Sequence, residues 1–185
     1  DGVVIKLGRK FSHMQLISPT EIQLGAACLN YNVAQFCLNH NLSGMEFLIG
    51  IPGSIGGGLA MNAGAYGREF KDIVKQVTAL DEGGNIHILS NRDMGFVYRG
   101  NTLPENMIFV EAIFELRPDE SAVIKSKIDE ISAKRAATQP IKEKTTGSTF
   151  ANPKGHKAWQ LIDDAGMRGM RIGDAQMSEQ HCNFM

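Results

Sequence analysis

The sequence predicts an α+β fold in two regions, residues 1–118 and 119–185. Short apolar segments bounded by turn residues predict strands throughout the first region. Segments with helical apolar periodicity are few and mostly short, and the longest of them opens the second region. Strands backed by short helices are the arrangement of an α+β protein.

Composition limits the kinds of protein this can be. The chain has 185 residues, 43% of them hydrophobic, and a net charge of −1, which fits a globular protein of one or two domains. It has no membrane-length apolar run and no signal peptide, and its balanced charge argues against a nucleic-acid partner. Cys28, Cys37 and Cys182 form no C-x-x-C pair, so we expect buried thiols in a reducing cytoplasm and no metal site. We expect a monomer that does not bind membranes.

The first elements are two strands and a helix. The apolar run Val3–Leu7 predicts a buried strand, and Glu21–Gly25 predicts a second, short one. A helix is predicted from about Asn32 to His40. The apolar side chains on one face of this helix are Val33, Phe36 and Cys37. We interpret that face as core packing rather than a binding surface.

A hairpin and a long strand complete the first region. Residues 73–80 and 85–89 predict two strands, joined by a turn at Asp81–Gly84. His87 alternates with isoleucines, so we expect it on the solvated face. Residues 107–116 predict a long apolar strand.

Two helices are predicted in the second region. The first runs from about Glu120 to Ala137, because isoleucines recur at positions 124, 128 and 131. The second is short and amphipathic, covers Ala158–Asp163, and ends before Gly166.

The stretch Gly50–Gly67 is the main functional signal. It holds seven of the chain's 20 glycines, and no lysine or arginine. It can therefore offer main-chain N–H groups, the raw material of an anion-binding nest or helix N-terminus, together with the Ser54 hydroxyl and the Asn62 amide. This predicts a loop that holds a phosphate-bearing cofactor against the main chain. The spacing matches neither G-x-G-x-x-G nor a P-loop, so an ordinary structural loop remains the alternative.

Two further polar residues are candidates for chemistry, and one adjacent pair is excluded. Arg99 could bind a carboxylate in bidentate fashion, or it could be a surface charge. Ser148 lies in a Thr-rich turn without the G-x-S-x-G elbow of a serine nucleophile. His181 and Cys182 are adjacent in sequence and would point apart on a strand, so we exclude them as a catalytic pair.

Several blocks resemble one enzyme family. Residues 46–67 closely resemble the flavin-binding segment of UDP-N-acetylenolpyruvoylglucosamine reductases, also called the MurB family. The match is nearly complete over Pro52–Gly57 and Met61–Gly67. The Tyr98-Arg99 pair and the block Gly147–Pro153 follow in the family's order, and its C-terminal-domain pattern continues to Met185.

The resemblance implies a fold and a cofactor site. Residues 1–118 would form a flavin-binding domain of the two-part FAD-binding (PCMH-like) type, and 119–185 a smaller α+β substrate-binding domain. The residues expected to bind FAD are Pro52, Gly53, Ser54, Ile55, Gly56, Gly57, Asn62, Gly64 and Ala65. The family's N-terminal flavin loop and its C-terminal end, with a catalytic glutamate, would lie outside this sequence. We therefore expect residues 1–185 alone to bind FAD poorly or not at all.

The resemblance also implies a reaction. NADPH would reduce FAD, and the flavin would pass hydride to UDP-N-acetylglucosamine enolpyruvate, giving UDP-N-acetylmuramate for peptidoglycan synthesis. Arg99 would stabilise the charge that develops at the substrate carboxylate, and Ser148 would donate a proton. Tyr98 and Asn152 would contact the substrate.

Two other functions are open. The chain could be a non-catalytic binding protein, since one flavin loop and the glutamate are missing from the sequence. It could also be another two-part flavoenzyme, such as an alcohol oxidase. The Gly147–Pro153 block and the Tyr98-Arg99 pair argue against this last possibility.

Overall fold

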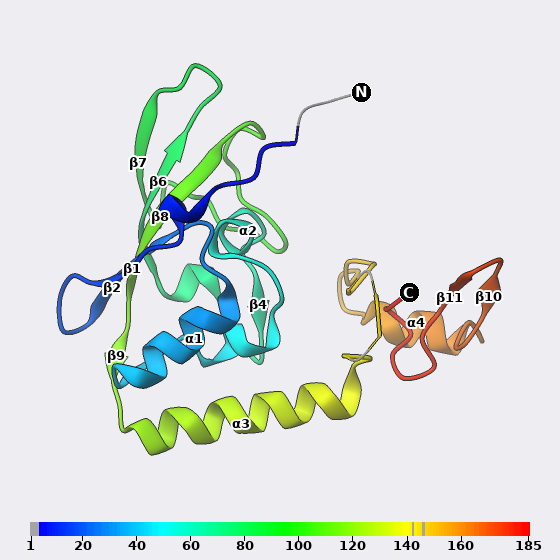
Figure 1. Ribbon diagram of the computed structural model, residues 1–185. Helices are drawn as coiled ribbons and strands as arrows, with labels where there is room; N and C mark the ends of the chain where they lie inside the picture. The colour runs from blue at the N-terminus through cyan, green and yellow to red at the C-terminus, as the bar shows by residue number, and fades with distance from the viewer. Residues whose placement is uncertain (1–3, 142, 146) are drawn as a thin grey trace. The chain divides into compact units, whose positions relative to one another are not determined.

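The computed structural model of the protein describes residues 4–141, 143–145 and 147–185 (Figure 1). The chain forms two compact units, Asp1–Ile131 and Ser132–Met185. Helix α3, Ser121–Thr138, contributes residues to both units. The predicted domain boundary at residue 118 lies just before this helix.

A five-stranded antiparallel sheet forms the centre of the first unit (Figure 1). Its strands, in spatial order, are β1 (Met14–Leu16), β2 (Glu21–Gly25), β8 (Ile108–Glu115), β6 (Val74–Leu80) and β7 (Ile86–Ser90). β8 lies in the middle and pairs with β2 on one side and β6 on the other. The prediction of a strand at Glu21–Gly25 is confirmed, as is the long strand before residue 116.

Short helices cover the sheet and supply the other half of the core. They are α1 (Asn30–Asn39), the 3-10 helix η2 (Glu46–Gly50) and α2 (Ile55–Ala60). The face of α1 predicted to pack inward does so, because Val33 and Cys37 are buried and Phe36 packs against them. A strand and helix layer of this kind confirms the α+β class.

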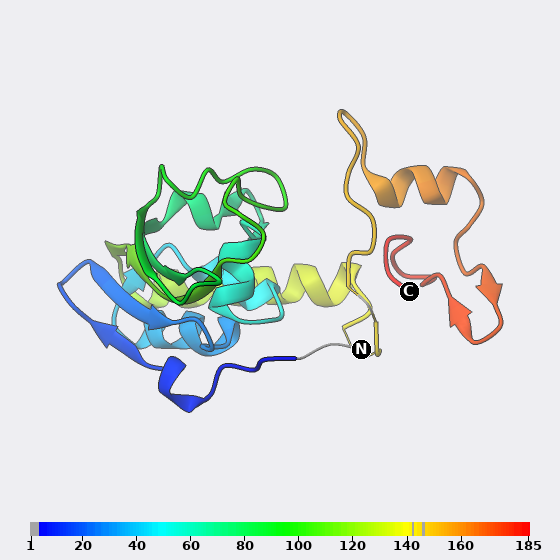
Figure 2. The same cartoon turned by 90° about the horizontal axis from the view of Figure 1, so that it is seen from above.

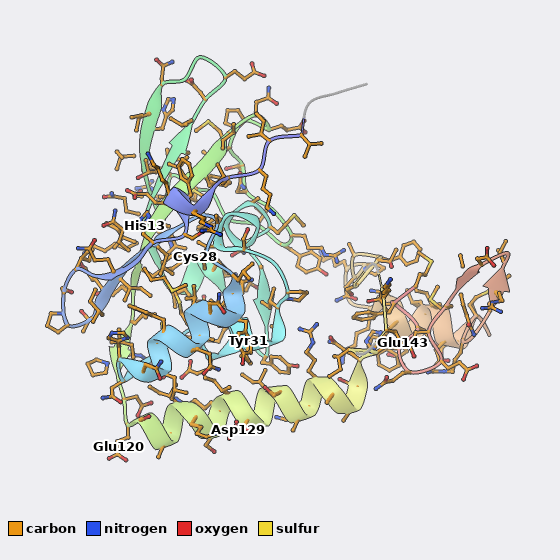
Figure 3. All side chains as sticks on the ribbon, in the orientation of Figure 1. His13, Cys28, Tyr31, Glu120, Asp129 and Glu143 are labelled. Atoms are coloured by element: carbon orange, nitrogen blue, oxygen red, sulfur yellow. The ribbon has the colours of Figure 1, made fainter. Side chains whose placement is uncertain are left out.

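Smaller pieces join these elements. In the described part of the first unit, the remaining strands are β3 (Leu42–Ser43), β9 (Arg117–Pro118), β4 (Gly64–Ala65) and β5 (Arg68–Glu69), and the remaining 3-10 helices are η1 (Arg9–Phe11) and η3 (Phe70–Asp72). β3 pairs with β9, and β4 pairs with β5. At the end of β2, the Cys28 thiol donates to the carbonyl oxygen of His13 over 3.1 Å, and Figure 3 labels both residues.

The predicted N-terminal strand is wrong over its described residues. Residues 4–7 have no strand structure, and the side chains of Val4 and Ile5 are 95% and 74% exposed. Val3 lies outside the described residues. An apolar run becomes a strand only where another strand pairs with it, and the first strand in the sheet is β1.

The β6–β7 hairpin is confirmed, but its faces are the reverse of the prediction. Ile86 and Ile88 are 70% and 58% exposed, whereas His87 is half-buried. His87 Nε2 lies 2.8 Å from a carboxylate oxygen of Asp81, at the end of the partner strand. This contact holds His87 against the hairpin and leaves the isoleucines on the outer face.

Helix α3 begins in the first unit and is held there by apolar and ionic contacts. Ile124 and Ile128 are buried, as their spacing predicts. The Lys127 ammonium lies 3.1 Å from a carboxylate oxygen of Asp119 and 3.5 Å from one of Glu46. Glu46 is itself buried, so the first turns of α3 are joined to η2 through a charged network.

The second unit contains one further helix and a small hairpin (Figure 2). They are α4 (Ala158–Asp164), β10 (Arg171–Ile172) and β11 (Ala175–Gln176). The predicted helix at Ala158–Asp163 is confirmed. Arg168 links helix α4 to the segment after β11. Its guanidinium donates to both carboxylate oxygens of Asp163 and to the carbonyl oxygen of Glu179.

The three cysteines are free and buried. Burial, reinforced by the charge of Glu46, raises the pKa of the Cys37 thiol to about 12, so this thiol is unreactive near neutral pH. In the described ranges, no helix is both long and apolar enough to cross a membrane.

Candidate functional site

The glycine-rich stretch folds as a loop, the short helix α2 and the β4–β5 hairpin. Ser54 is the N-cap of α2, and its Oγ accepts the N–H of Gly57. Gly53, just before it, is exposed and has φ of +116°, a conformation that side chains strongly disfavour. The loop therefore needs a glycine at position 53 to turn into the helix.

Part of the expected row of free main-chain amides is already in use. The N–H of Ile55 donates to the carbonyl of Cys28 at 2.9 Å, and that of Gly56 donates to Ala26 at 2.8 Å. Among the residues that the structure describes, the N–H groups of Gly53 and Ser54 have no acceptor. The groups available to an anion are therefore fewer than the sequence suggested, and they are concentrated at these two positions.

The space around each glycine shows whether it leaves room for a ligand or allows close packing. A Cβ at Gly53 would meet nothing within 4 Å. A Cβ at Gly58 would lie 2.1 Å from the Phe70 ring, and one at Gly56 would lie 3.1 Å from the Cβ of Ala26. The surface at Gly53 is open to a phosphate group, whereas Gly56 and Gly58 allow α2 to pack closely. This arrangement fits the diphosphate of FAD.

Asn62 is buried, and its side chain is used within the chain. Its Oδ1 accepts the N–H of Lys71 at 3.0 Å. Its Nδ2 donates to the Glu69 carboxylate at 2.8 Å and to the carbonyl of Val97 at 3.1 Å. These bonds pin the segment before Tyr98 to the glycine-rich stretch. A contact between Asn62 and FAD stays a prediction.

The Tyr98-Arg99 pair occupies a tight turn closed by two hydrogen bonds. The N–H of Val97 donates to Gly100 at 3.0 Å, and the N–H of Gly100 donates back at 3.3 Å. Tyr98 is exposed, and Arg99 is half-buried with φ of +59°. Asn101 ties the other side of the turn to the carbonyl oxygen at the end of α2, that of Ala60, at 3.0 Å. The structure thus brings Arg99 beside the glycine-rich stretch.

The remaining predicted FAD contacts lie on the same stretch. Pro52 is exposed at the start of the loop, whereas Gly64 and Ala65 form β4. A Cβ at Gly64 would lie 2.7 Å from the carbonyl oxygen of Arg68, so glycine is required there for strand pairing. Their contacts with a cofactor stay predictions.

Ser148 and Asn152 belong to one loop of the second unit. Ser148 is exposed, and its Oγ accepts a hydrogen bond from Nδ2 of Asn183 at 2.9 Å. Asn152 is also exposed, and its Oδ1 accepts the N–H of Ala158 at 2.9 Å. Asn152 therefore helps to begin helix α4. Thr146, just before the Gly147–Pro153 block, lies outside the described residues.

No sequence motif assigns a role to Asn183. This residue is buried, and it holds the loop that carries Ser148. It belongs to a recognised block, but no local pattern links it to a partner 35 positions earlier. Its own N–H donates to Nδ1 of His181 at 3.2 Å, and burial lowers the pKa of that imidazole.

Arg99 belongs to the first unit and Ser148 to the second, so their convergence on one substrate stays a prediction. No group of three or more His, Cys, Asp or Glu side chains in the described part of the chain could hold a metal ion.

Comparisons with known proteins give a consistent result. Two family models match, one described as an FAD binding domain over residues 1–90 and one as the C-terminal domain of UDP-N-acetylenolpyruvoylglucosamine reductase over 139–185. The reductases of that name from Rickettsia peacockii and Rickettsia bellii (strain RML369-C) are 56% and 54% identical over 185 residues, all of this chain. The chain spans 62% and 61% of their lengths. The crystal structure of the Thermus caldophilus reductase is 34% identical, with a TM-score of 0.87 over 97% of this chain and 65% of its own.

Proposed function

The chain belongs to the UDP-N-acetylenolpyruvoylglucosamine reductase family, and we propose that it is part of an enzyme that reduces UDP-N-acetylglucosamine enolpyruvate to UDP-N-acetylmuramate with NADPH. The product would feed peptidoglycan synthesis. The observation that carries the proposal is the anchoring of the Arg99 turn to the glycine-rich stretch by Asn62 and Asn101. It holds the turn that carries Arg99 against the glycine-rich stretch, which supports a shared site for substrate and flavin.

Gly53 and Ser54 are the residues that would hold FAD most directly. Their main-chain N–H groups are available, and the surface at Gly53 is open. When bound, FAD supplies the redox chemistry, taking a hydride from NADPH and giving it to the enolpyruvyl double bond. Residues 1–118 would form the FAD-binding domain, and 119–185 the substrate-binding domain.

Arg99 would bind the substrate carboxylate. When hydride adds to one carbon of the double bond, negative charge develops on the other carbon and spreads into the neighbouring carboxylate. A guanidinium at that point stabilises this charge more than it stabilises the ground state, which is the kind of binding that accelerates a reaction. Tyr98, exposed on the same turn, would contact the substrate.

Ser148 would supply the proton that completes the reduction. Its hydroxyl is exposed, so a substrate can reach it. A serine hydroxyl is a weak acid, and it serves here because the carbon that receives the proton is strongly basic. Asn152, on the same loop, would contact the substrate from the beginning of α4.

We further propose a cytoplasmic monomer. The free thiols of Cys28, Cys37 and Cys182 support a reducing compartment.

The proposal is tested by separating the two half-reactions in the full-length protein. Ser148→Ala should leave flavin reduction by NADPH unchanged and slow flavin reoxidation by the enolpyruvyl substrate at least ~100-fold, the usual effect of losing an acid catalyst. Stopped-flow absorbance of the flavin measures both steps. Ser132→Ala, an exposed change on α3, is the matched control and should alter neither. Normal rates in both steps for Ser148→Ala would refute the role, and a wild-type protein without flavin would refute the function.

A further inference from the structure

We propose that Asn183 is a positioning residue that orients the Ser148 hydroxyl and strengthens it as a proton donor. This inference rests on the proposed function, because it concerns the proton that Ser148 would deliver. It is carried by four hydrogen bonds that join Asn183 to Ser148, Thr149 and Phe150.

Asn183 forms hydrogen bonds to Ser148 and to the two residues that follow it in the loop. Nδ2 donates to Ser148 Oγ at 2.9 Å and to the carbonyl oxygen of Phe150 at 2.9 Å. Oδ1 accepts the N–H of Phe150 at 2.9 Å, and the carbonyl oxygen of Asn183 accepts the N–H of Thr149 at 2.9 Å. Asn183 is only 3% exposed, so water does not compete for these bonds. The serine loop is thereby fixed to a buried residue.

The orientation of the amide follows from the main chain. The N–H of Phe150 can only donate, so its partner must be the oxygen of Asn183. The carbonyl of Phe150 can only accept, so its partner must be the nitrogen. The same nitrogen contacts Ser148 Oγ, and it has no lone pair to accept a proton. Ser148 Oγ must therefore be the acceptor in this bond.

This assignment has two consequences for the hydroxyl. Because Oγ accepts from Asn183, the Ser148 proton is not donated to that amide. After the proton moves to the basic carbon, the N–H of Asn183 stabilises the alkoxide left on Oγ, as an oxyanion-hole donor does. The alkoxide then takes a proton from water, which restores the serine and releases hydroxide.

Asn183→Asp is the variant that tests the direction of the bond. A carboxylate is similar in size and can still accept the N–H of Phe150, but it has no hydrogen for Oγ. The Ser148 hydroxyl would then donate to the carboxylate, and its proton would be withheld from the substrate. In the full-length protein we expect unchanged flavin reduction by NADPH and ~100-fold slower reoxidation by the enolpyruvyl substrate near pH 8. The reoxidation rate should rise again as pH falls, because a protonated aspartic acid regains a donor.

Gln180→Glu is the matched control. It makes the same change from amide to carboxylate in the same segment, but the Gln180 amide donates to the carbonyl oxygens of Ala136 and Ala137 and not to the serine. It should show neither the slow reoxidation nor the recovery at low pH. An equal effect of both variants on the reoxidation rate would overturn the proposal, because the slower rate would then come from a general disturbance of this segment.

A double-variant cycle gives a second readout. If Asn183 acts through Ser148, Asn183→Asp should add nothing to the reoxidation defect of Ser148→Ala. If Asn183 only supports the fold, the two defects should multiply, and the proposal is wrong. The same cycle is repeated with Asn183→Ala in place of Asn183→Asp, because alanine introduces no buried charge. Loss of cooperative unfolding in both Asn183 variants would also overturn it, because Asn183 would then serve the fold rather than the serine.

The outcomes distinguish a failure of this inference from a failure of the proposed function on which it rests. If the wild type does not reoxidise its flavin with the enolpyruvyl substrate, the proposed function fails. If the wild type does so and Asn183→Asp matches its rate and pH dependence, only the role of Asn183 fails.

Discussion

Arg99 adopts a left-handed backbone conformation that costs a residue with a side chain about 1–2 kcal/mol relative to the right-handed one. It does so at the third position of a turn whose two sides are tied to α2 and to Asn62. Strained residues of this kind persist where surrounding contacts determine the conformation, and they are frequent at functional sites. The backbone turn that carries Arg99 is thus held from both sides.

Replacing Arg99 with glycine separates the strain from the charge. In Arg99→Gly, relief of the left-handed conformation is offset by the greater freedom of glycine in the unfolded chain. We therefore expect the free energy of unfolding to change by no more than about 1 kcal/mol. Reoxidation of the flavin by substrate should fall by about 10²–10³-fold with the loss of charge stabilisation. Urea unfolding and stopped-flow absorbance measure the two effects, and a rate near that of wild type would remove Arg99 from the mechanism.

His181 gives the second unit a dependence on pH. Burial lowers the pKa of its imidazole from its usual 6.5, and a nearby guanidinium, that of Arg168, acts in the same direction. Between the lowered value and 6.5 the unfolded chain binds more protons than the folded one, so the stability contribution is lost as pH falls through this window. Protonation would also remove the acceptor for the N–H of Asn183.

We expect this effect in denaturant unfolding followed by the fluorescence of Trp159. The midpoint for the second unit should fall between about pH 7 and pH 5, and the fall should be smaller in His181→Gln, which cannot take up the proton. An unchanged pH dependence in that variant would show that other groups are responsible.

At the scale of elements, helix α2 needs glycine at position 58 for close packing, and the loop before it has glycine at position 53, where the surface is open. In Gly58→Ala the new methyl group would overlap the Phe70 ring, so we expect a loss of about 1–3 kcal/mol in unfolding free energy. Gly57→Ala places its methyl group 3.8 Å from Ser54 Oγ, an ordinary contact, and should stabilise the helix by up to about 1 kcal/mol. Thermal unfolding of the two variants provides the comparison, and equal destabilisation would contradict it.

Elements with a complete local signal were predictable from the sequence. The alternating run at Glu21–Gly25, the β6–β7 hairpin and helix α4 follow from patterns within each segment. The run Val4–Leu7 has the same apolar character but no strand beside it, and only the tertiary structure decides that. Alternation alone predicts the wrong face for His87, because it does not register the contact of His87 with Asp81.

The candidate site can be proposed from the sequence as a set of residues, but its hydrogen bonds cannot. The glycine-rich stretch, Arg99 and Ser148 are visible in sequence motifs. The pairing of the Ile55 amide, the left-handed φ of Arg99 and the clamp by Asn183 each depend on a partner elsewhere in the chain. No periodicity or composition records such partners.

At the scale of the whole molecule, buried and bonded carboxylates make the protein sensitive to acid. Burial opposes the charge of Glu46, but hydrogen bonds from the Ser43 hydroxyl and the Gly44 N–H, with the charge of Lys127, lower its pKa below 4.5. The Asp163 carboxylate in the second unit also has a lowered pKa, caused first by its bonds to Arg168. Groups of this kind stabilise the fold above their unfolded pKa, and that stabilisation is lost as pH falls through the folded value.

Glu46→Gln should therefore flatten the dependence of unfolding free energy on pH below about 4.5. It should also weaken the attachment of α3, because Lys127 loses one of its carboxylate partners. Hydrogen exchange at residues 121–131 and urea unfolding at several pH values measure the two effects. Glu105→Gln, a change at an exposed loop carboxylate, should alter neither.

The Phe70 ring stands where a side chain at position 58 would begin. A residue larger than glycine at position 58 is therefore destabilising unless a smaller one stands at position 70. Related proteins should vary at the two sites in step, and a larger residue at position 58 of α2 would have to be combined with a smaller one at position 70.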